Sequence, residues 1–242
     1  MDRVIYLAMA GAKAMMQRQD VLAHNLANAS TPGFRAELTA FRSVPVLGDG
    51  ASTRVYALES TPGYSAEAGP ITSTARPLDV AMKGNAWLAV QGADGTEAYT
   101  RSGSLDIDNE GLMITRSGLP VQGDGGPISV PQNAQVMIGA DGTVSATVQG
   151  GRPQVVGRLK LVSPEAPLLR GDDGLFRAAQ GDLAADAGAR LQAESLEGSN
   201  VSPVESMVAM IAAARQFEQQ MKMLQTSQER EQSATRLLGN SG

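Results

Sequence analysis

Both ends of this chain carry apolar residues at the spacing of an α-helix, and a turn-rich region separates them. In the first thirty residues, apolar and small side chains recur at steps of three and four positions, the a/d pattern of a coiled coil. The stripe consists of Ile5, Ala8, Ala12, Met15, Gln19, Leu22 and Leu26. Proline and glycine follow at Pro32 and Gly33, so the pattern predicts a helix over residues 3–28.

The C-terminal segment begins with a complete helix start signal. Ser202 can cap the first turn, Pro203 suits the first helical position, and Glu205 completes a capping box. A second stripe with steps of three and four follows: Met207, Met210, Ala214, Phe217, Met221 and Leu224. These signals predict a helix over residues 203–238, closed by Gly239 and roughly 54 Å long at about 1.5 Å per residue.

The central region has the pattern of short β-strands joined by tight turns. Leu105 and Ile107 alternate with Asp106 and Asp108, as in a strand with one buried face. Asp-Gly dipeptides between apolar runs mark tight turns at residues 94–95, 124–125, 141–142 and 173–174. Because no stretch of helical periodicity interrupts this region, parallel βαβ units are not expected. We predict a mostly antiparallel β domain.

Composition excludes several classes of function. The chain has no cysteine and a single histidine, so disulfides and thiolate metal sites are excluded. Acidic residues outnumber basic ones, 25 to 20, and this gives no sign of a nucleic-acid-binding surface. Aromatic residues are 4% of the chain, which is few for a deep enzyme cleft. No apolar run approaches the roughly 18–20 residues of a transmembrane helix.

The start of the chain also resembles a secretion signal. Residues 4–12 are largely apolar, and Ala8-Met9-Ala10 is similar to a cleavage site. Asp2 and Arg3 cancel in charge, however, so the positive start of such a signal is missing. The helical pattern also continues past this point to Leu26. We therefore favour a helix of the mature protein over a cleaved signal.

Three local patterns could carry chemistry, and each has a simpler explanation. The segment 106–111 resembles the start of a calcium loop, but the twelfth position, Ser117, lacks the required carboxylate. A glycosidase needs facing carboxyl groups beside stacking aromatics, whereas Trp87 is isolated in an apolar stretch and is expected to be a half-buried core residue. His24 is expected to be a surface or packing residue. We predict no catalytic residue, no metal and no cofactor.

Methionine and alanine dominate the two helical stripes. Of the eleven methionines, eight lie in the end segments. Alanine allows helices to approach closely, and methionine adapts to varied neighbours. Such a stripe is most often part of its own domain's core. Because one helix pair of this kind is marginal in water, we interpret the stripes as surfaces that also pack against other molecules.

Motifs at both ends together resemble one protein family. Asn25-Leu-Ala-Asn-Ala-Ser-Thr-Pro-Gly-Phe34 is similar to the N-terminal motif of the axial proteins of the bacterial flagellum, which form its rod and hook. Leu196-Glu-Gly-Ser-Asn-Val201 and Arg215-x-Phe-Glu218-x-x-x-Lys222 resemble the family's C-terminal motif. Between them, Pro77-Leu-Asp-Val80 and Tyr99-Thr-Arg101 are similar to the family's β domain.

Ala86-Trp87-Leu88 replaces the Gly-Phe-Phe that is usual in hook and distal-rod members, so the resemblance is closest to proximal-rod members. It implies a structural subunit of the periplasm-spanning drive shaft of the basal body, which transmits torque and encloses the export channel. It implies no enzyme activity and no cofactor. The implied partners are other proximal and distal rod proteins, copies of the chain itself, and the flagellar type III export apparatus, with no nucleic acid and no direct membrane span.

The resemblance also implies an α+β fold in which the N- and C-terminal helices pair as an antiparallel coiled coil. The expected segments are an N-terminal helix (1–34), an extended connector (35–74), a β domain (75–199) and a C-terminal helix (200–242). The two stripes, without Gln19, which interrupts the first, are the candidate subunit interface. Further candidates for polar contacts between helices are Asn28, Arg215, Glu218 and Lys222, of which Glu218 and Lys222 are spaced for an ion pair one turn apart. Two alternatives remain: a distal-rod subunit, and a secreted carbohydrate-binding β protein anchored by helical ends.

Overall fold

The computed structural model describes residues 2–45 and 55–239, and within them the side chains of residues 9–40, 63–229 and 233. The chain forms two compact units. The helical unit comprises Met1–Ala29, Glu37–Ser65 and Val201–Gly242, and the β unit comprises Ser30–Ala36 and Ala66–Asn200.

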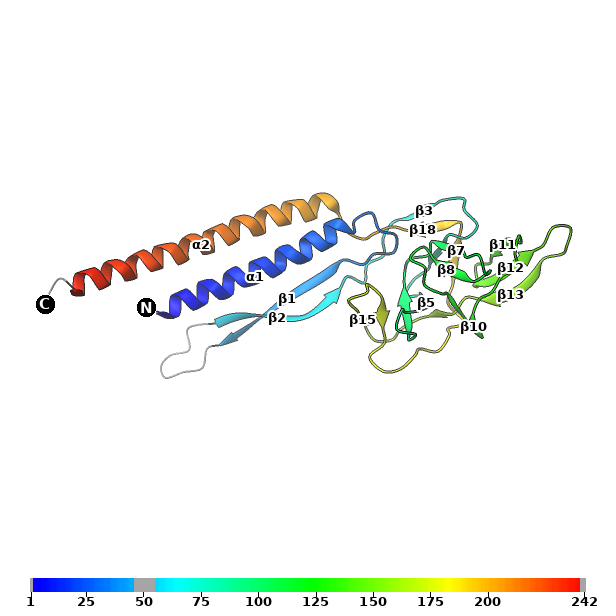
Figure 1. The fold of residues 1–242 in the computed structure, drawn as a ribbon, viewed down its shortest axis with the longest axis horizontal. Helices are drawn as coiled ribbons and strands as arrows, with labels where there is room; N and C mark the ends of the chain where they lie inside the picture. Colours follow the sequence, from blue (N-terminus) through cyan, green and yellow to red (C-terminus); the bar gives the residue numbers. More distant parts are fainter. Residues whose placement is uncertain (1, 46–54, 240–242) are drawn as a thin grey trace. The chain divides into compact units, whose positions relative to one another are not determined.

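Two long helices dominate the helical unit. Helix α1 covers Asp2–Ala27 and helix α2 covers Pro203–Gly239, close to the predicted ranges. They lie side by side and run antiparallel (Figure 1), while the finer coiled-coil packing stays a prediction. At the start of α2, the Ser202 hydroxyl accepts a hydrogen bond from the Glu205 N–H at 3.4 Å, as the predicted cap requires. Neither helix has, in its described residues, an apolar stretch long enough to cross a membrane.

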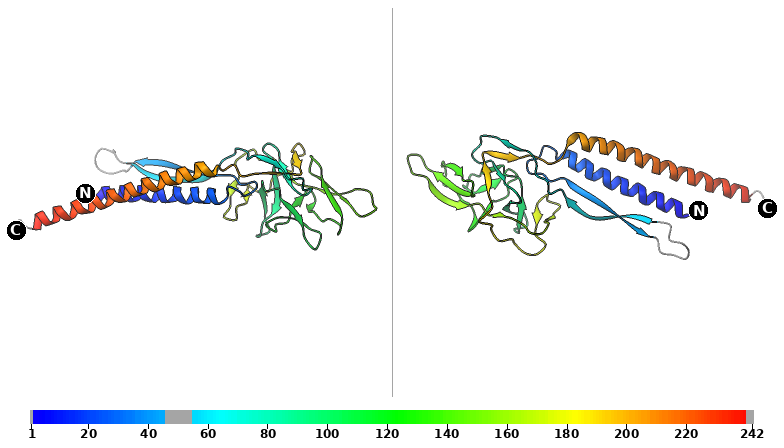
Figure 2. Two further views of the ribbon diagram at one scale, coloured as in Figure 1. Left: turned by 90° about the horizontal axis from the view of Figure 1, so that it is seen from above. Right: turned by 180° about the vertical axis from the view of Figure 1, so that it is seen from behind.

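A β-hairpin completes the helical unit. Strand β1 (Glu37–Pro45) pairs antiparallel with β2 (Val55–Tyr64), beginning with Glu37 opposite Tyr64. Helix α1 lies between α2 and this hairpin (Figures 1 and 2). Residues 35–74 are predicted to be an extended connector, and the pairing of β1 with β2 is not predicted, because prolines, glycines and serines interrupt the alternation in this segment.

The β unit is built from antiparallel ladders. Its largest sheet has five strands in the order β14-β5-β6-β16-β15. Strands β11, β12 and β13 form a second sheet (Figure 1). Every ladder between strands of the described chain is antiparallel, in agreement with the predicted β domain. The strands are β3 (Ile71–Ser73), β4 (Val80–Met82), β5 (Trp87–Gln91), β6 (Glu97–Thr100), β7 (Leu105–Ile107), β8 (Met113–Thr115), β9 (Gln122–Gly123), β10 (Gly126–Pro127), β11 (Gln135–Ile138), β12 (Thr143–Thr147), β13 (Gln154–Arg158), β14 (Leu161–Val162), β15 (Leu169–Arg170), β16 (Phe176–Arg177), β17 (Leu191–Ala193) and β18 (Ser195–Glu197).

All four predicted Asp-Gly turns join paired strands, at β5–β6, β9–β10, β11–β12 and β15–β16. In the first of them, Gly95 has φ +81°, a conformation that glycine adopts without strain. Asp94 Oδ1 accepts hydrogen bonds from the Thr96 N–H at 3.0 Å and from its hydroxyl at 2.7 Å. These bonds favour the carboxylate and lower the pKa of Asp94.

One apolar core lies between the sheets of the β unit. Its fully buried members include Val80, Met82, Leu88 and Leu191. Trp87, predicted to be half-buried, is only 3% exposed and packs against Phe176 with ring centroids 4.7 Å apart. Trp87 therefore offers no stacking surface to a sugar.

Candidate assembly surfaces and the junction of the two motifs

One side of α2 is covered by α1. Burial along α2 repeats at steps of four and three residues, the heptad spacing of a helix packed along a partner. Ala213 is 2% exposed, and Gln220 lies so close to Gly11 of α1 that a Cβ added at Gly11 would come within 3.3 Å of its Cδ. We call this covered row the α2 seam. It consists of Ser206, Met210, Ala213, Phe217, Gln220, Leu224 and Ser227.

The predicted stripe of α2 overlaps this seam only in part. Three of its members, Met210, Phe217 and Leu224, belong to the α2 seam, and half-buried Ala214 lies beside it. Met207 is 51% exposed and Met221 is 39% exposed, because Ser206 and Gln220 occupy the covered positions next to them. A hydrophobic pattern cannot assign serine and glutamine to a seam, and this is why the prediction is displaced by one residue at those turns.

The opposite side of α2 is exposed and carries a second row. Val204, Val208 and Ile211 are 70%, 63% and 57% exposed. Val204 lies nine residues from Ala213, or two and a half turns, which places it on the far side of the helix from α1. The same row continues with exposed Arg215, Glu218 and Lys222. We call the six residues Val204, Val208, Ile211, Arg215, Glu218 and Lys222 the outer α2 face.

The ion pair predicted between Glu218 and Lys222 is not formed. Among the ion pairs of the described side chains, none joins these two residues. Asn28, another predicted polar contact, donates from its side-chain amide to the His24 carbonyl at 2.9 Å and so satisfies the last turn of its own helix.

Helix α1 is covered on two of its sides. Ala12 and Ala14 are 7% and 4% exposed. They are two positions apart in the sequence, so they point in directions about 200° apart around the helix. The remaining side is open and carries Met9 and Met16, 54% and 53% exposed. Of the predicted N-terminal stripe, Met15, Leu22 and Leu26 are half-buried, and the side chains of Ile5 and Ala8 lie outside the described residues.

The N-terminal motif begins with a clamp between α1 and β1. Asn25 Oδ1 accepts from the Glu37 N–H at 2.8 Å, and Asn25 Nδ2 donates to the Glu37 carbonyl at 2.9 Å. His24 Nδ1 lies 3.0 Å from Glu37 Oε2, with 45% of the histidine side chain exposed. The histidine is thus a surface residue that contacts the hairpin, as expected.

The end of the same motif is held inside the β unit. Gly33 has φ +70°, and a Cβ at this position would overlap the Arg101 carbonyl group. The Arg170 guanidinium lies over the Phe34 ring, 4.6 Å from its centroid, and donates to the Arg35 carbonyl at 3.2 Å. Residues 33–35 are therefore fixed by backbone approach, by a cation–π contact and by a hydrogen bond.

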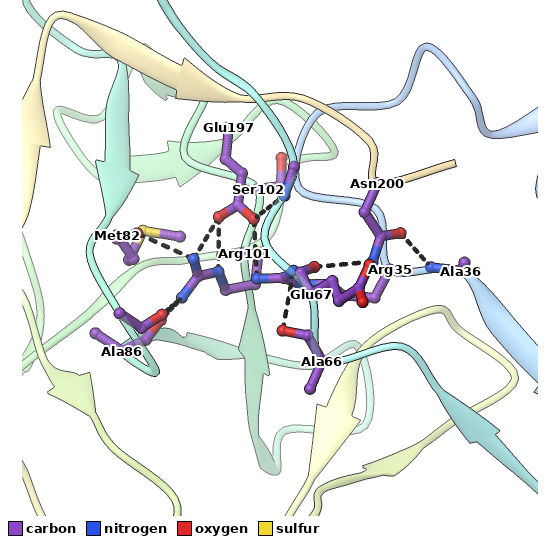
Figure 3. A network of polar contacts seen from close by, with 12 residues as sticks. Arg35, Ala36, Ala66, Glu67, Met82, Ala86, Arg101, Ser102, Glu197 and Asn200 are labelled. Atoms are coloured by element: carbon purple, nitrogen blue, oxygen red, sulfur yellow. Dashed lines mark hydrogen bonds and ion pairs between the residues drawn. The ribbon is translucent and has the colours of Figure 1, made fainter. Parts of the chain in front are cut away.

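A buried ionic network joins Arg35, the residue directly after the N-terminal motif, to Glu197 of the C-terminal motif (Figure 3). Glu197 Oε1 lies 2.9 Å from Arg35 Nη2, and Glu197 Oε2 accepts from Arg101 Nε at 2.8 Å. The three side chains are 1–3% exposed. Arg101 also donates to the carbonyls of Met82, at 3.0 Å, and of Ala86. These bonds satisfy charges that would otherwise be costly to bury.

Asn200, three residues after Glu197, forms a second cluster of bonds in the β unit (Figure 3). Its Oδ1 accepts from the Ala36 N–H at 2.7 Å, and its Nδ2 donates to the Glu67 carbonyl at 2.9 Å. Its own N–H donates to the Phe34 carbonyl at 3.3 Å. Asn200 thus joins three segments that are far apart in the sequence. Asn200 lies inside the C-terminal motif, but no sequence pattern predicts these contacts.

The segment considered as a calcium loop forms a tight turn. Asp108 Oδ1 accepts from the N–H groups of Glu110 at 2.9 Å and Leu112 at 2.8 Å, and Gly111 has φ +83°. In the part of the chain that the structure describes, no three acidic or histidine side chains gather in a way that could hold a metal ion.

Three families of known proteins match successive parts of the chain. Residues 5–35 match the flagella basal body rod protein family, residues 81–146 match the flagellar hook protein FlgE/F/G D1 domain, and residues 192–237 match the flagellar basal body rod FlgEFG protein C-terminal family. The first match includes Arg35 and the last includes Glu197, the two residues that form an ion pair in Figure 3.

Full-length relatives agree with these matches. The flagellar basal-body rod protein FlgF of Salmonella typhimurium is 49% identical, and that of Escherichia coli is 48% identical, each over the whole of both chains. The chain belongs to the FlgF group of flagellar basal-body rod proteins. FlgG of Bacillus subtilis is more distant, 30% identical over 95% of this chain and 96% of its own. This rod protein is a structural subunit of the proximal rod in the flagellar basal body. It is not an enzyme, and its partners are other rod components.

Proposed function

We propose that this rod subunit transmits torque in the periplasm by packing its outer α2 face against helices of neighbouring rod subunits around the export channel. The observation that carries this proposal is the exposed row of Val204, Val208 and Ile211. Exposed apolar side chains in one row of a soluble chain mark a surface that another molecule covers. Their heptad spacing fits a helical partner, because such a row packs into the groove of another helix.

The charged half of the outer α2 face supports the same proposal. Arg215, Glu218 and Lys222 alternate in sign along the row, and Glu218 forms no ion pair with Lys222 within the described chain. A neighbouring helix with the opposite sequence of charges would satisfy all three, and a shifted neighbour would bring like charges together. Alternating charge of this kind specifies the register of a helix pair.

The remaining predicted features fit the same arrangement. In the proposed rod, residues 1–34 and 200–242 form an inner layer of antiparallel coiled coils, residues 75–199 form an outer β domain, and residues 35–74 connect them. The half-buried Met15 and Leu22 stabilise the helix pair, and Met207 and Met221 extend its outward contacts. The proposed partners are proximal and distal rod proteins and copies of this chain, and delivery is proposed to occur through the flagellar export apparatus.

Cross-linking in the assembled basal body tests this proposal directly. Because the chain has no cysteine, a single Val208→Cys variant can carry a thiol-linked photo-cross-linker at one defined position. We expect light-dependent adducts with other rod proteins in purified basal bodies. The same probe at Lys83, an exposed position of the β unit, controls for random contact.

The identity of the adducts also separates the proximal from the distal position in the rod. A proximal subunit yields mainly adducts with other proximal rod proteins, and a distal subunit yields mainly adducts with distal-rod and hook-side proteins. Basal bodies that contain the Val208→Cys chain and yield no adduct from position 208 would refute the proposed interface.

A further inference from the structure

The backbone passes four times between the helical unit and the β unit, after residues 29, 36, 65 and 200. Force exchanged between the two units through the chain has to enter the β unit at these passages. Whether the passages are held together inside the β unit therefore determines whether such force is shared among them or acts on one strand at a time.

Three of these passages meet at Asn200. Asn200 is the last residue of the β unit before the fourth passage, and Ala36 is the last residue before the second. The 2.7 Å bond from the Ala36 N–H to Asn200 Oδ1 joins these two directly. The 2.9 Å bond from Asn200 Nδ2 to the carbonyl of Glu67 adds the third passage, which enters the β unit at Ala66.

The buried ionic network makes a second set of contacts to the same segments. Arg35 Nη1 donates to the Ala66 carbonyl at 3.4 Å, while Arg35 Nη2 lies 2.9 Å from Glu197. The Gly69 N–H donates to Glu197 Oε1 at 3.1 Å, and the Gly33 N–H donates to the Glu197 carbonyl at 2.7 Å. Through Gly33, the segment that follows the first passage joins the same cluster.

We propose that Asn200, supported by the Arg35–Glu197 pair, is a positioning residue that gathers the four backbone passages into one mechanical clamp at the edge of the β unit. This inference rests on the proposed torque-transmitting function for its purpose, but the clamp itself is a property of the single chain. Bonds that act in parallel must break together, so the clamp resists peeling of any one segment more strongly than separate bonds would.

The role of Asn200 depends on the carboxamide and not on size alone. Ala36 requires an acceptor and Glu67 requires a donor, and asparagine supplies both from one side chain. Aspartate keeps the acceptor and loses the donor, and alanine loses both. Both substitutions therefore weaken the clamp.

Single-molecule pulling on the full-length purified chain tests the clamp without the flagellum. Cysteines introduced as Gln149→Cys and Gln225→Cys, both exposed, attach the handles to the β unit and to α2. Loss of two hydrogen bonds predicts that Asn200→Ala raises the rate of the first opening under constant force by about tenfold or more. Asn200→Asp is also expected to open faster than the wild type, because its carboxylate loses the donor and faces the Glu67 carbonyl with a second acceptor.

Asn109→Ala, in an exposed turn of the β unit, is the matched control and should open at the wild-type rate. Fluorescence of Trp87, the single tryptophan, reports folding of the β unit at zero force. If Asn200→Ala does not fold, the Asn200→Asp variant carries the test. Equal opening rates for a folded Asn200 variant and the control would overturn the clamp, even if thermal unfolding of the variant were shifted. A cross-linking result at position 208 has no bearing on this outcome.

Discussion

Asn25 of α1 binds Glu37 of β1 as a neighbouring β-strand would. Its side-chain amide accepts from the Glu37 N–H at 2.8 Å and donates to the Glu37 carbonyl at 2.9 Å, which is the paired pattern of an antiparallel ladder. Asn25 is 7% exposed, so water has little access to replace these bonds. The first residue of the hairpin is thereby fixed to the helix.

Asn25→Asp should loosen the hairpin. The carboxylate keeps the bond from the Glu37 N–H, loses the donor to the Glu37 carbonyl, and faces that carbonyl with a second acceptor. We expect the helical unit to lose about 1–3 kcal/mol of unfolding free energy, measured by chemical denaturation with circular dichroism. Asn109→Asp makes the same chemical change at an exposed turn and should cost less than about 0.5 kcal/mol. Equal effects would show that the Asn25 bonds contribute nothing specific.

Features set by neighbouring residues could be predicted from the sequence. The capping residues Ser202 and Glu205 locate the start of α2, and the four Asp-Gly dipeptides locate hairpin turns, because each signal acts within a few residues. The antiparallel character of the β unit follows in the same way, since strands joined by tight turns have to pair antiparallel.

Features set by distant residues could not be predicted. Arg101 and Glu197 each lie inside a motif and Arg35 directly follows one, but only the fold brings their charges together. The seam position of Gln220 was missed for a related reason: it is covered because Gly11 of α1 leaves room for it, and no pattern within α2 contains that information. The pairing of β1 with β2 likewise depends on a partner strand that composition does not reveal.

Gly33→Ala should destabilise the β unit through two separate effects. The alanine has to adopt φ +70°, and its Cβ would overlap the Arg101 carbonyl. Gly118→Ala is a matched control, because Gly118 has φ +83° and no atom lies within 4 Å of the added Cβ. We expect a loss of about 1–2 kcal/mol for the control and a larger loss for Gly33→Ala, measured by Trp87 fluorescence during denaturation. Equal losses would show that the close approach of the two backbones is unimportant.

Ala12→Asp should unfold the helical unit before the β unit. Ala12 is 7% exposed, and its native side chain needs no polar partner. An aspartate there would bury a carboxyl group and lower the unfolding free energy by about 2 kcal/mol or more. Helical circular dichroism should be lost at lower temperature while the Trp87 transition stays near the wild-type temperature. Ala23→Asp, at an exposed position of the same helix, is the control. In cells, we expect Ala12→Asp to block rod assembly, and its normal incorporation into rods would contradict burial of this side of α1.

We expect the β unit to lose stability at alkaline pH because of Tyr99. Burial raises the pKa of the Tyr99 hydroxyl, and its 2.8 Å hydrogen bond to Glu97 Oε1 raises it further, although the Leu183 N–H that it accepts acts in the opposite direction. The folded state therefore favours the protonated phenol. The stabilisation of the folded state that comes from this raised pKa is fully present below the unfolded pKa of about 10, and it is lost as pH rises above that value.

A spectrophotometric titration of phenolate formation tests this sign. The component of phenolate formation that belongs to Tyr99 is expected to appear late, only as Trp87 fluorescence reports unfolding of the β unit. Tyr99→Phe should remove this late component and flatten the alkaline decline in stability. It should also cost about 1–3 kcal/mol at neutral pH, because the Leu183 N–H loses its acceptor. In denaturant, Tyr99 should titrate near the unfolded pKa of about 10. Ionisation of Tyr99 in the folded chain well before the fluorescence change would show that its burial does not protect the protonated form.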